Sequence, residues 1–137
     1  MQQTLMMIKP DAVGRNLIGR ILERVESAGL RIAQLRMVRL RPEEARAFYR
    51  VHEGKPFLDS LVAFMSSGDI VAGVLEGEDA VRRWRELMGA TDPAKAAPGT
   101  IRKDFAESIE RNSVHGSDAP ETARDEIAFF GLNRDLR

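Results

Sequence analysis

The chain is 137 residues long, balances 21 basic against 21 acidic side chains, and contains no cysteine. One domain spanning residues 1–137 is expected, because a chain of this length can bury a core without disulfides. The lack of cysteine excludes thiolate metal sites and thiol nucleophiles. Zero net charge argues against a specific nucleic-acid or anionic-membrane binder, although it permits a local cluster of cations aimed at phosphates.

The sequence contains no pattern typical of membrane targeting. Met1 leads directly into a short apolar segment, which is not the pattern of a cleaved signal peptide. No apolar run approaches the roughly 20 residues that a membrane-spanning helix needs. We therefore expect a cytoplasmic protein with no membrane partner, and the lack of cysteine fits a reducing compartment.

Strands and helices alternate from the N-terminus onward. Residues 4–8 (TLMMI) are almost wholly apolar, as in a strand covered on both faces. A helix follows, which Asn16 is expected to cap and Gly29 to end. Apolar and polar residues nearly alternate over 30–40, which predicts a strand, and a phase change near Gln34 indicates a β-bulge.

The middle of the chain predicts helices around one further strand. Pro42 begins a short helix, and residues 58–65 form a second one. Residues 70–75 (IVAGVL) read as a buried strand. Apolar residues then repeat at helical spacing over 80–88, where Trp84 is expected in the core or a subunit interface.

The last helix follows a long irregular region, residues 89–116. Only one short helix, within 103–109, is expected in that region, and its spaced cations favour an ordered binding loop over a surface loop without a role. Asp118 and Glu121 have the spacing of a capping box at the start of the last helix. The order of elements indicates an α/β sandwich with helices packed on a small sheet.

His115 is the strongest candidate nucleophile. It lies where the irregular region meets the last helix, and neutral imidazole is nucleophilic and well populated near physiological pH. Gly116 leaves room for a bulky group, and the nearby helix start offers backbone N–H groups to an anion. This segment alone does not separate a nucleophile from a structural histidine at a helix cap.

Four further side chains are suited to holding a polyphosphate. Lys9 closes the first strand, Arg85 borders an apolar helix face that leaves it half-covered, and Thr91 and Arg102 lie in the irregular region. Arginine offers a planar, bidentate donor and lysine a point charge. Each of these residues by itself is also explained as a solvated surface group.

Tyr49 and Phe57 flank a turn that also contains His52. An exposed Phe57 can stack on a base, although core packing is the commoner use of an aromatic ring. We interpret His52 as a solvated turn histidine. The chain's two histidines have no other ligands at metal-binding spacing, so no metal held by the protein alone is expected.

Five segments, taken together and in this order, closely resemble the nucleoside diphosphate kinase family. They are residues 8–13 (IKPDAV), 48–57 (FYRVHEGKPF), 87–93 (LMGATDP), 98–105 (PGTIRKDF) and 112–118 (NSVHGSD). The similarity runs from about residue 4 to about residue 130. The GxxxxGK[ST] and GxGxxG phosphate-binding patterns do not occur in the chain.

This resemblance implies a fold, a reaction and an assembly. The fold is ferredoxin-like, βαββαβ, with helices covering a four-stranded antiparallel sheet. The reaction moves the γ-phosphoryl group of a nucleoside triphosphate to a nucleoside diphosphate by a ping-pong mechanism through phosphohistidine, with Mg²⁺ on the nucleotide phosphates. The assembly is a homo-oligomer, a tetramer or hexamer built from dimers.

The resemblance also implies roles for single residues. His115 matches the phosphorylated histidine, Tyr49 a tyrosine near it, and Ser117 and Glu126 its supporting groups. The residues that match nucleotide contacts are Lys9, Phe57, Arg85, Thr91, Arg102 and Asn112, of which Phe57 stacks on the base, and Lys9 and Asn112 also serve catalysis. Glu126 has an independent argument: it borders the apolar face of the last helix, where a carboxylate can bind the ring nitrogen that does not attack.

Two other functions fit the same fold. One is a ligand-sensing or RNA-binding module. The neutral net charge and the few aromatic residues argue against RNA binding. The other is a catalytically silent relative that acts as an interaction protein. The presence of His115 and of the full set of cations argues against it.

Overall fold

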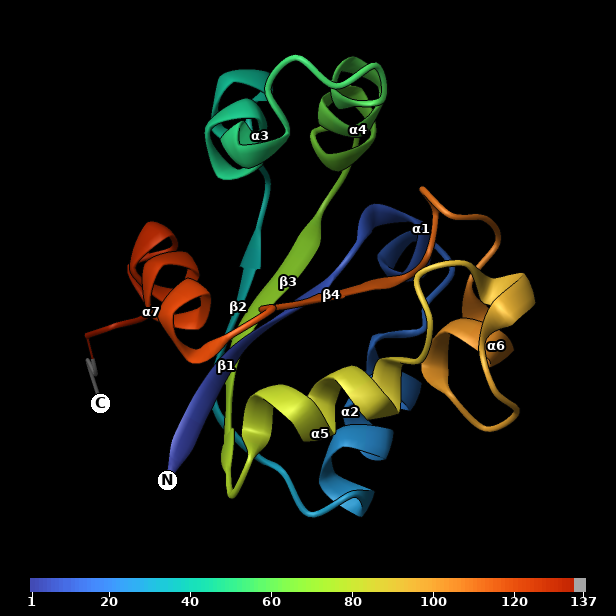
Figure 1. Ribbon diagram of the computed structural model, residues 1–137, viewed down its shortest axis with the longest axis vertical. Helices are drawn as coiled ribbons and strands as arrows, with labels where there is room; N and C mark the ends of the chain where they lie inside the picture. The colour runs from blue at the N-terminus through green and yellow to red at the C-terminus, as the bar shows by residue number, and fades with distance from the viewer. Residues whose placement is uncertain (135–137) are drawn as a thin grey trace.

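A four-stranded sheet organises the protein, whose computed structural model describes residues 1–134; the last three residues of the predicted domain lie outside the described part. The strands are β1 (Gln2–Ile8), β2 (Arg31–Val38), β3 (Ile70–Gly77) and β4 (Val114–Gly116), in the order β2-β3-β1-β4. Every neighbouring pair is antiparallel. The ferredoxin-like βαββαβ prediction is confirmed (Figure 1).

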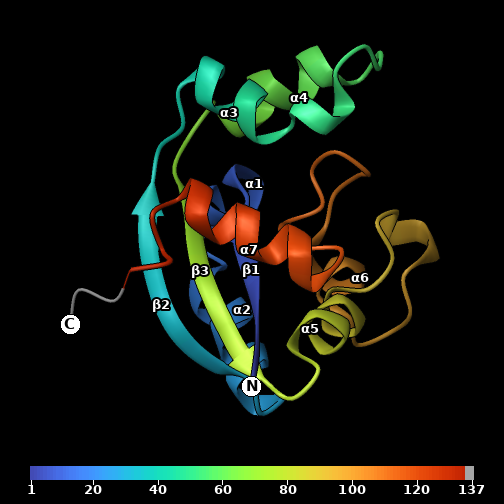
Figure 2. The same cartoon turned by 60° about the vertical axis from the view of Figure 1, so that its left-hand side comes forward.

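Helices cover both faces of this sheet (Figures 1 and 2). Strand β1 shows why, because Leu5 and Met7 belong to one buried apolar cluster while Met6 and Ile8 belong to another. Helices α3, α4 and α7 contribute to the first cluster, and α1, α2 and α5 to the second. The helices are α1 (Pro10–Gly14), α2 (Ile18–Ser27), α3 (Pro42–Phe48), α4 (Leu58–Met65), α5 (Ala80–Met88), α6 (Ile101–Phe105) and α7 (Pro120–Phe129), with 3₁₀ turns η1 (Arg50–His52) and η2 (Pro93–Lys95).

Two predictions in the first half are confirmed and one is wrong. The register of β2 against β3 shifts between Ile32 and Gln34, which is the predicted bulge. Gly29 follows the end of α2 with φ of 85°, a left-handed conformation that glycine adopts without strain. Asn16 does not cap α2, because the helix begins at Ile18 with Leu17 in the capping position. Asn16 instead has φ of 61° and turns the chain between α1 and α2.

Two helix starts in the second half also differ from prediction. The short helix expected within 103–109 is α6, which begins earlier because the Thr100 hydroxyl accepts a bond from Lys103 N (3.3 Å). The capping box of Asp118 and Glu121 does not form, since α7 begins at Pro120 and the Asp118 carboxylate binds elsewhere.

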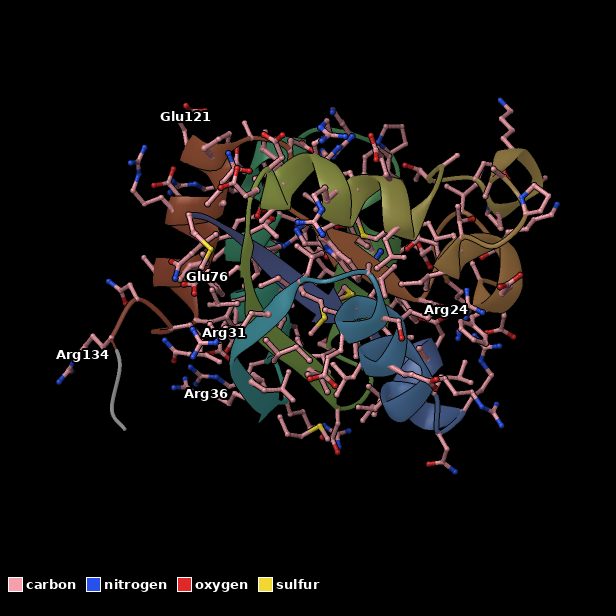
Figure 3. The ribbon with its side chains drawn as sticks, turned by 90° about the horizontal axis from the view of Figure 1, so that it is seen from below. Arg24, Arg31, Arg36, Glu76, Glu121 and Arg134 are labelled. Carbon is pink, nitrogen blue, oxygen red and sulfur yellow. The ribbon has the colours of Figure 1, made fainter. Side chains whose placement is uncertain are left out.

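Strand β4 is short, and periodicity did not predict it. It pairs with β1 so that His115 lies opposite Met7, and His115 is therefore a strand residue rather than a helix-cap residue. The irregular region before it is anchored at α6, where Arg24 of α2 (labelled in Figure 3) binds Asp104 (2.6 Å) and covers the Phe105 ring. In residues 1–134, no helix has the length and apolarity to cross a membrane, and the cytoplasmic location stays a prediction.

Candidate functional site

The His115 ring is held on several sides. It packs edge-on against Phe48 and Tyr49, with ring centroids 5.4 Å and 6.3 Å away, and its side chain is 20% exposed. Its Nε2 lies 3.2 Å and 3.3 Å from the two carboxylate oxygens of Glu126. A carboxylate at Nε2 favours the tautomer with the proton there, which leaves the Nδ1 lone pair for another partner.

Glu126 is itself fixed by a chain of hydrogen bonds that reaches the sheet. The Ser117 hydroxyl donates to Glu126 Oε1 (2.7 Å), and the backbone N–H of Leu5 donates to Ser117 Oγ (3.3 Å). Leu5 lies on the central strand β1, so the carboxylate is oriented by a rigid element.

Gly116 serves packing rather than access to the site. A Cβ atom at this position would lie 2.6 Å from Met88 Cε and 2.6 Å from Trp84 Cδ1, so the expectation that Gly116 leaves room for a bulky group is wrong. The close approach lets α5 pack on β4, where the fully buried Trp84 donates from Nε1 to the His115 carbonyl oxygen (3.1 Å). Trp84 therefore lies in the core, as predicted, and it fixes the backbone beneath the histidine.

Lys9 is a buried cation at the end of β1. Its Nζ donates to Asn112 Oδ1 (2.8 Å), and Asn112 in turn donates from Nδ2 to the Thr91 carbonyl oxygen (3.3 Å). Burial, assisted by the positive charge of Arg102, lowers the pKa of Lys9 to about 8. The ammonium group is therefore held by a neutral amide, with its charge poorly compensated.

Arg102 is a second buried cation with neutral partners. Its two terminal nitrogens donate to the carbonyl oxygens of Gly89 (3.0 Å) and Val114 (2.9 Å), and its buried Nε has no partner among the described residues. Burial, with a smaller contribution from Arg85, lowers the pKa of Arg102 to about 10. Within residues 1–134, no carboxylate lies within ion-pair distance of Lys9 or Arg102, although isolated buried charges are strongly disfavoured. An anionic ligand would compensate both.

A buried network that the sequence analysis missed sets the path of the chain into β4. Ser113 has φ of 73°, and its hydroxyl donates to Asp11 Oδ2 (3.0 Å). Arg15 binds the same Asp11 oxygen (3.3 Å) and the Phe105 carbonyl oxygen (2.6 Å), while Lys9 N donates to Ser113 O (2.9 Å). Neither helical nor strand periodicity marks these polar residues, because Ser113 and the Phe105 carbonyl group are distant in sequence from Lys9, Asp11 and Arg15.

An aromatic cluster borders the histidine on the side of η1. Phe57 is 46% exposed, and its ring lies 5.1 Å from that of His52, which stacks at 6.3 Å on Tyr49. His52 lies in the η1 turn, as predicted, but it is less solvated than expected, because its ring is half-buried in this cluster and its Nδ1 lies 3.2 Å from Lys55 Nζ. The Tyr49 hydroxyl is buried and has no hydrogen-bond partner within residues 1–134. Burial, together with the Glu126 charge, raises the pKa of Tyr49.

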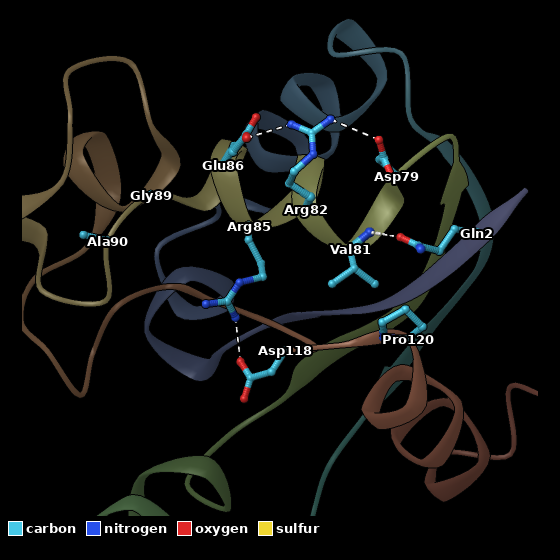
Figure 4. A pocket seen from close by; sticks show the side chains of 10 residues that line it. All are labelled: Gln2, Asp79, Val81, Arg82, Arg85, Glu86, Gly89, Ala90, Asp118 and Pro120. Carbon is cyan, nitrogen blue, oxygen red and sulfur yellow. Dashed lines mark hydrogen bonds and ion pairs between the residues drawn. The ribbon is translucent and has the colours of Figure 1, made fainter.

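Arg85 forms the exposed border of the site. Its side chain is 49% exposed and its Nη1 lies 2.6 Å from Asp118 Oδ1 (Figure 4). The pair lies in a groove of about 630 Å³ along the outer side of α5, which His115, Lys9 and Arg102 do not line. Asp118 was assigned no chemical role from the sequence, and only the fold reveals its partner.

The predicted site residues thus converge from distant parts of the chain. One group surrounds the histidine and a second surrounds the two buried cations. Strand β4 joins them, because it carries His115 and also Val114, whose carbonyl oxygen accepts from Arg102. The first contains Tyr49, His115, Ser117 and Glu126, the second Lys9, Thr91, Arg102 and Asn112, with Arg85 and Phe57 at the borders. Thr91 contributes its carbonyl oxygen to this arrangement.

Known proteins match the chain along nearly its whole length. The family model for nucleoside diphosphate kinase matches residues 2–135. A nucleoside diphosphate kinase of Halorhodospira halophila is 60% identical over 129 residues, which cover 94% of this chain and 92% of the relative. That of Campylobacter hominis is 58% identical over 136 residues, 99% of each chain.

Solved structures agree with this match. The Aquifex aeolicus nucleoside diphosphate kinase superposes with a TM-score of 0.91 at 47% identity, over 94% of both chains. The halophilic nucleoside diphosphate kinase of Halobacterium salinarum, solved in complex with CDP, has a TM-score of 0.91 at 46% identity, over 94% of this chain and 86% of that one.

Proposed function

The chain belongs to the nucleoside diphosphate kinase family, and we propose that His115 carries the phosphoryl group between its nucleotides. The activity is transfer of the terminal phosphoryl group from a nucleoside triphosphate to a nucleoside diphosphate. The observation that carries the proposal is the contact of Glu126 with Nε2 of His115, on the strand whose Val114 binds the buried Arg102. Among residues 1–134, neither Arg102 nor the second buried cation, Lys9, has a carboxylate partner. A held imidazole and unpaired positive charge are what a phosphohistidine mechanism needs.

The nucleophile in this mechanism is Nδ1 of His115. A bond forms between Nδ1 and the γ-phosphorus while the bond from that phosphorus to the bridging oxygen breaks, and its electron pair leaves with the diphosphate. The proton stays on Nε2, from which it makes a hydrogen bond to the Glu126 carboxylate. Positive charge that develops on the ring therefore faces a carboxylate, which stabilises the intermediate. A second diphosphate then takes the group by the reverse step.

The cations supply the electrostatic part of the reaction. Lys9 and Arg102 are fixed before substrate arrives, so little reorganisation is needed when charge shifts to the leaving diphosphate. Arg85 adds a third positive charge at the border. Asn112 positions Lys9, and Thr91 positions Asn112 through its carbonyl oxygen.

Phe57 is the proposed platform for the base. Its ring is 46% exposed, with Lys55 Nζ 5.8 Å from the ring centroid, and every base offers a π-face, so purines and pyrimidines are accepted alike. Weak discrimination between bases suits an enzyme that equilibrates nucleotide pools.

A divalent metal ion accompanies the nucleotide in kinases of this family, and we propose that it is Mg²⁺ here. Within residues 1–134, no three or more His, Cys, Asp or Glu side chains are grouped so as to hold a metal ion. The donors around the site are mainly cationic, which fits a metal that arrives on the nucleotide phosphates and neutralises part of their charge.

The edge strand β2 supports the proposed homo-oligomer. Leu35 and Met37 on this strand are 46% and 55% exposed, and unpaired strand edges with apolar side chains favour association. We propose that a second copy covers this edge in a dimer, from which a tetramer or hexamer is built.

Phosphoryl transfer from ATP labelled at the γ-position tests the function. The wild-type chain takes up label that acid releases and base does not, and GDP removes it. His115→Ala takes up none, whereas His52→Ala, which removes the only other histidine, still becomes labelled. A ligand-sensing module would give no label on the wild-type protein, and a silent relative would give no exchange between ATP and added diphosphate. Normal turnover of pure His115→Ala would refute the nucleophile.

A further inference from the structure

Arg85 differs from the other two cations of the site in its partner. Lys9 is held by an amide oxygen and Arg102 by two backbone carbonyl oxygens, whereas Arg85 binds a carboxylate, Asp118, at 2.6 Å. A phosphate that binds Lys9 or Arg102 displaces no anion. A phosphate that binds Arg85 must displace the Asp118 carboxylate or lie beside it.

Asp118 has no other basic partner among the described residues. Its side chain is 81% exposed, and the neighbouring cation of the groove, Arg82, is already bound to Asp79 (3.2 Å) and Glu86 (2.8 Å), as Figure 4 shows. Its charge also acts on the site, because it raises the pKa of His52 against the larger lowering by burial and by Lys55. Asp118 is thus an anion bound to the border cation of a site for anions.

We propose that Asp118 is a positioning residue that holds Arg85 while the site is empty and competes with nucleotide phosphates for its guanidinium group. The inference rests on the proposed role of Arg85 as a phosphate ligand. Asp118 then weakens nucleotide binding and speeds the departure of product diphosphate. A ping-pong enzyme exchanges nucleotides twice in each cycle, so a faster dissociation rate benefits turnover.

Removing the charge of Asp118 isolates this effect. In Asp118→Asn, ADP binds roughly 3- to 10-fold more tightly in calorimetry and dissociates correspondingly more slowly, because an exposed ion pair is a weak competitor. The KM for diphosphate falls, while the rate of a single phosphoryl transfer is unchanged. The gain persists in EDTA, since Asp118 acts through Arg85 and not through a metal ion.

Asp79→Asn is the matched control. It removes a carboxylate of similar exposure from the same groove, one bound to Arg82, and asparagine keeps the left-handed φ of 50° found there. ADP binds this variant as it binds the wild type. An equal gain in Asp79→Asn would show a general charge effect and overturn the proposal.

A second variant tests the route through Arg85. In an Arg85→Gln background, Asp118→Asn changes ADP affinity less than about twofold. The same gain in both backgrounds, or weaker ADP binding in Asp118→Asn alone, would overturn the competition. Failure of the proposed function has a different signature, because the wild-type chain would then take up no label from γ-labelled ATP, whatever its affinity for ADP.

Discussion

The two cationic parts of the site are built in opposite ways. Lys9 and Arg102 are buried, tied to neutral oxygens, and have lowered pKa values. Arg85 is half-exposed and bound to a carboxylate that solvent surrounds. Burial of the Lys9 and Arg102 charges lowers the stability of the fold. The Arg85 charge costs almost nothing, because water screens it.

This difference assigns different tasks to the two parts. Fixed and poorly compensated charges stabilise a transition state strongly, since they need not reorganise when the phosphoryl group moves. An exchangeable ion pair suits binding and release instead. The buried part should therefore govern mainly the rate of transfer, and the exposed parts should govern mainly affinity.

Lys9→Met should give the largest effect and separates function from stability. We expect transfer to fall about 1,000-fold, as on removal of a preorganised charge, while the free energy of unfolding rises by roughly 1–3 kcal/mol because a poorly compensated buried charge is gone. Exchange kinetics and urea unfolding at neutral pH measure both quantities. Lys103→Met, which alters an exposed lysine, is the control and should change neither.

The pH dependence of stability provides a further check on Lys9. Its pKa is about 8 in the fold and ordinarily 10.5, so between these values the unfolded chain binds a proton that the folded wild type has lost. Wild-type stability therefore rises with pH in that range, and the advantage of Lys9→Met shrinks. An advantage that does not change from neutral pH upward would contradict a charged Lys9 in the buried part.

Glu126→Gln should slow transfer less than the loss of Lys9. The amide keeps the shape of the side chain but loses a charge-assisted bond to Nε2, which is expected to reduce the rate about 10- to 100-fold. Stopped-flow measurement of phosphoenzyme formation reports this step directly. Asp125→Asn, on the exposed side of α7, should leave it unchanged, and equal rates for the two variants would remove Glu126 from the mechanism.

Phe57→Ala should act on affinity alone. Loss of base stacking is expected to raise the KM for nucleotides about 10-fold, with a small change in thermal stability because the ring is half-exposed. Purine and pyrimidine substrates compared side by side measure the stacking. Val51→Ala changes an exposed apolar residue of the neighbouring η1 turn and should keep the wild-type KM; an unchanged KM in Phe57→Ala as well would exclude stacking.

The smallest expected effect is a loss of affinity at high pH. Lys9 loses its charge as pH passes its pKa of about 8, so ADP affinity should fall about 5-fold between pH 7 and pH 9. Calorimetric titration across this range measures the change. Lys9→Met should show a flatter profile. A wild-type ADP affinity that does not decline over this range would mean that the charge of Lys9 does not contribute to ADP binding.

Much of this arrangement could be predicted from the sequence. The rest could not, and the reasons are physical. Apolar runs predicted β1 and β3 because burial on both faces leaves a local pattern. Strand β4 has three residues, too few for any period, so only the family resemblance implied it. The Asp11 and Asp118 contacts join residues 102 and 33 positions apart, which local reasoning does not detect.

Gly116 shows the same limit of local reasoning. Gly116 was interpreted as space for a ligand because it neighbours the candidate nucleophile, and that local logic failed since the atoms that exclude a Cβ belong to α5. The Glu126 side chain, by contrast, was inferred from its place at the edge of a helical apolar face, and the structure brings it to Nε2 of His115. A helix face points in a predictable direction, whereas the neighbour of a glycine depends on tertiary packing.

The position of the phosphoryl group on the ring tests the central claim most directly. Phosphorus and nitrogen NMR of the protein after reaction with ATP should place that group on Nδ1 of His115, with Nε2 still protonated and bound to Glu126. Addition of GDP should discharge it to GTP. A phosphoryl group on Nε2, on another residue, or one that diphosphates fail to remove would contradict the account.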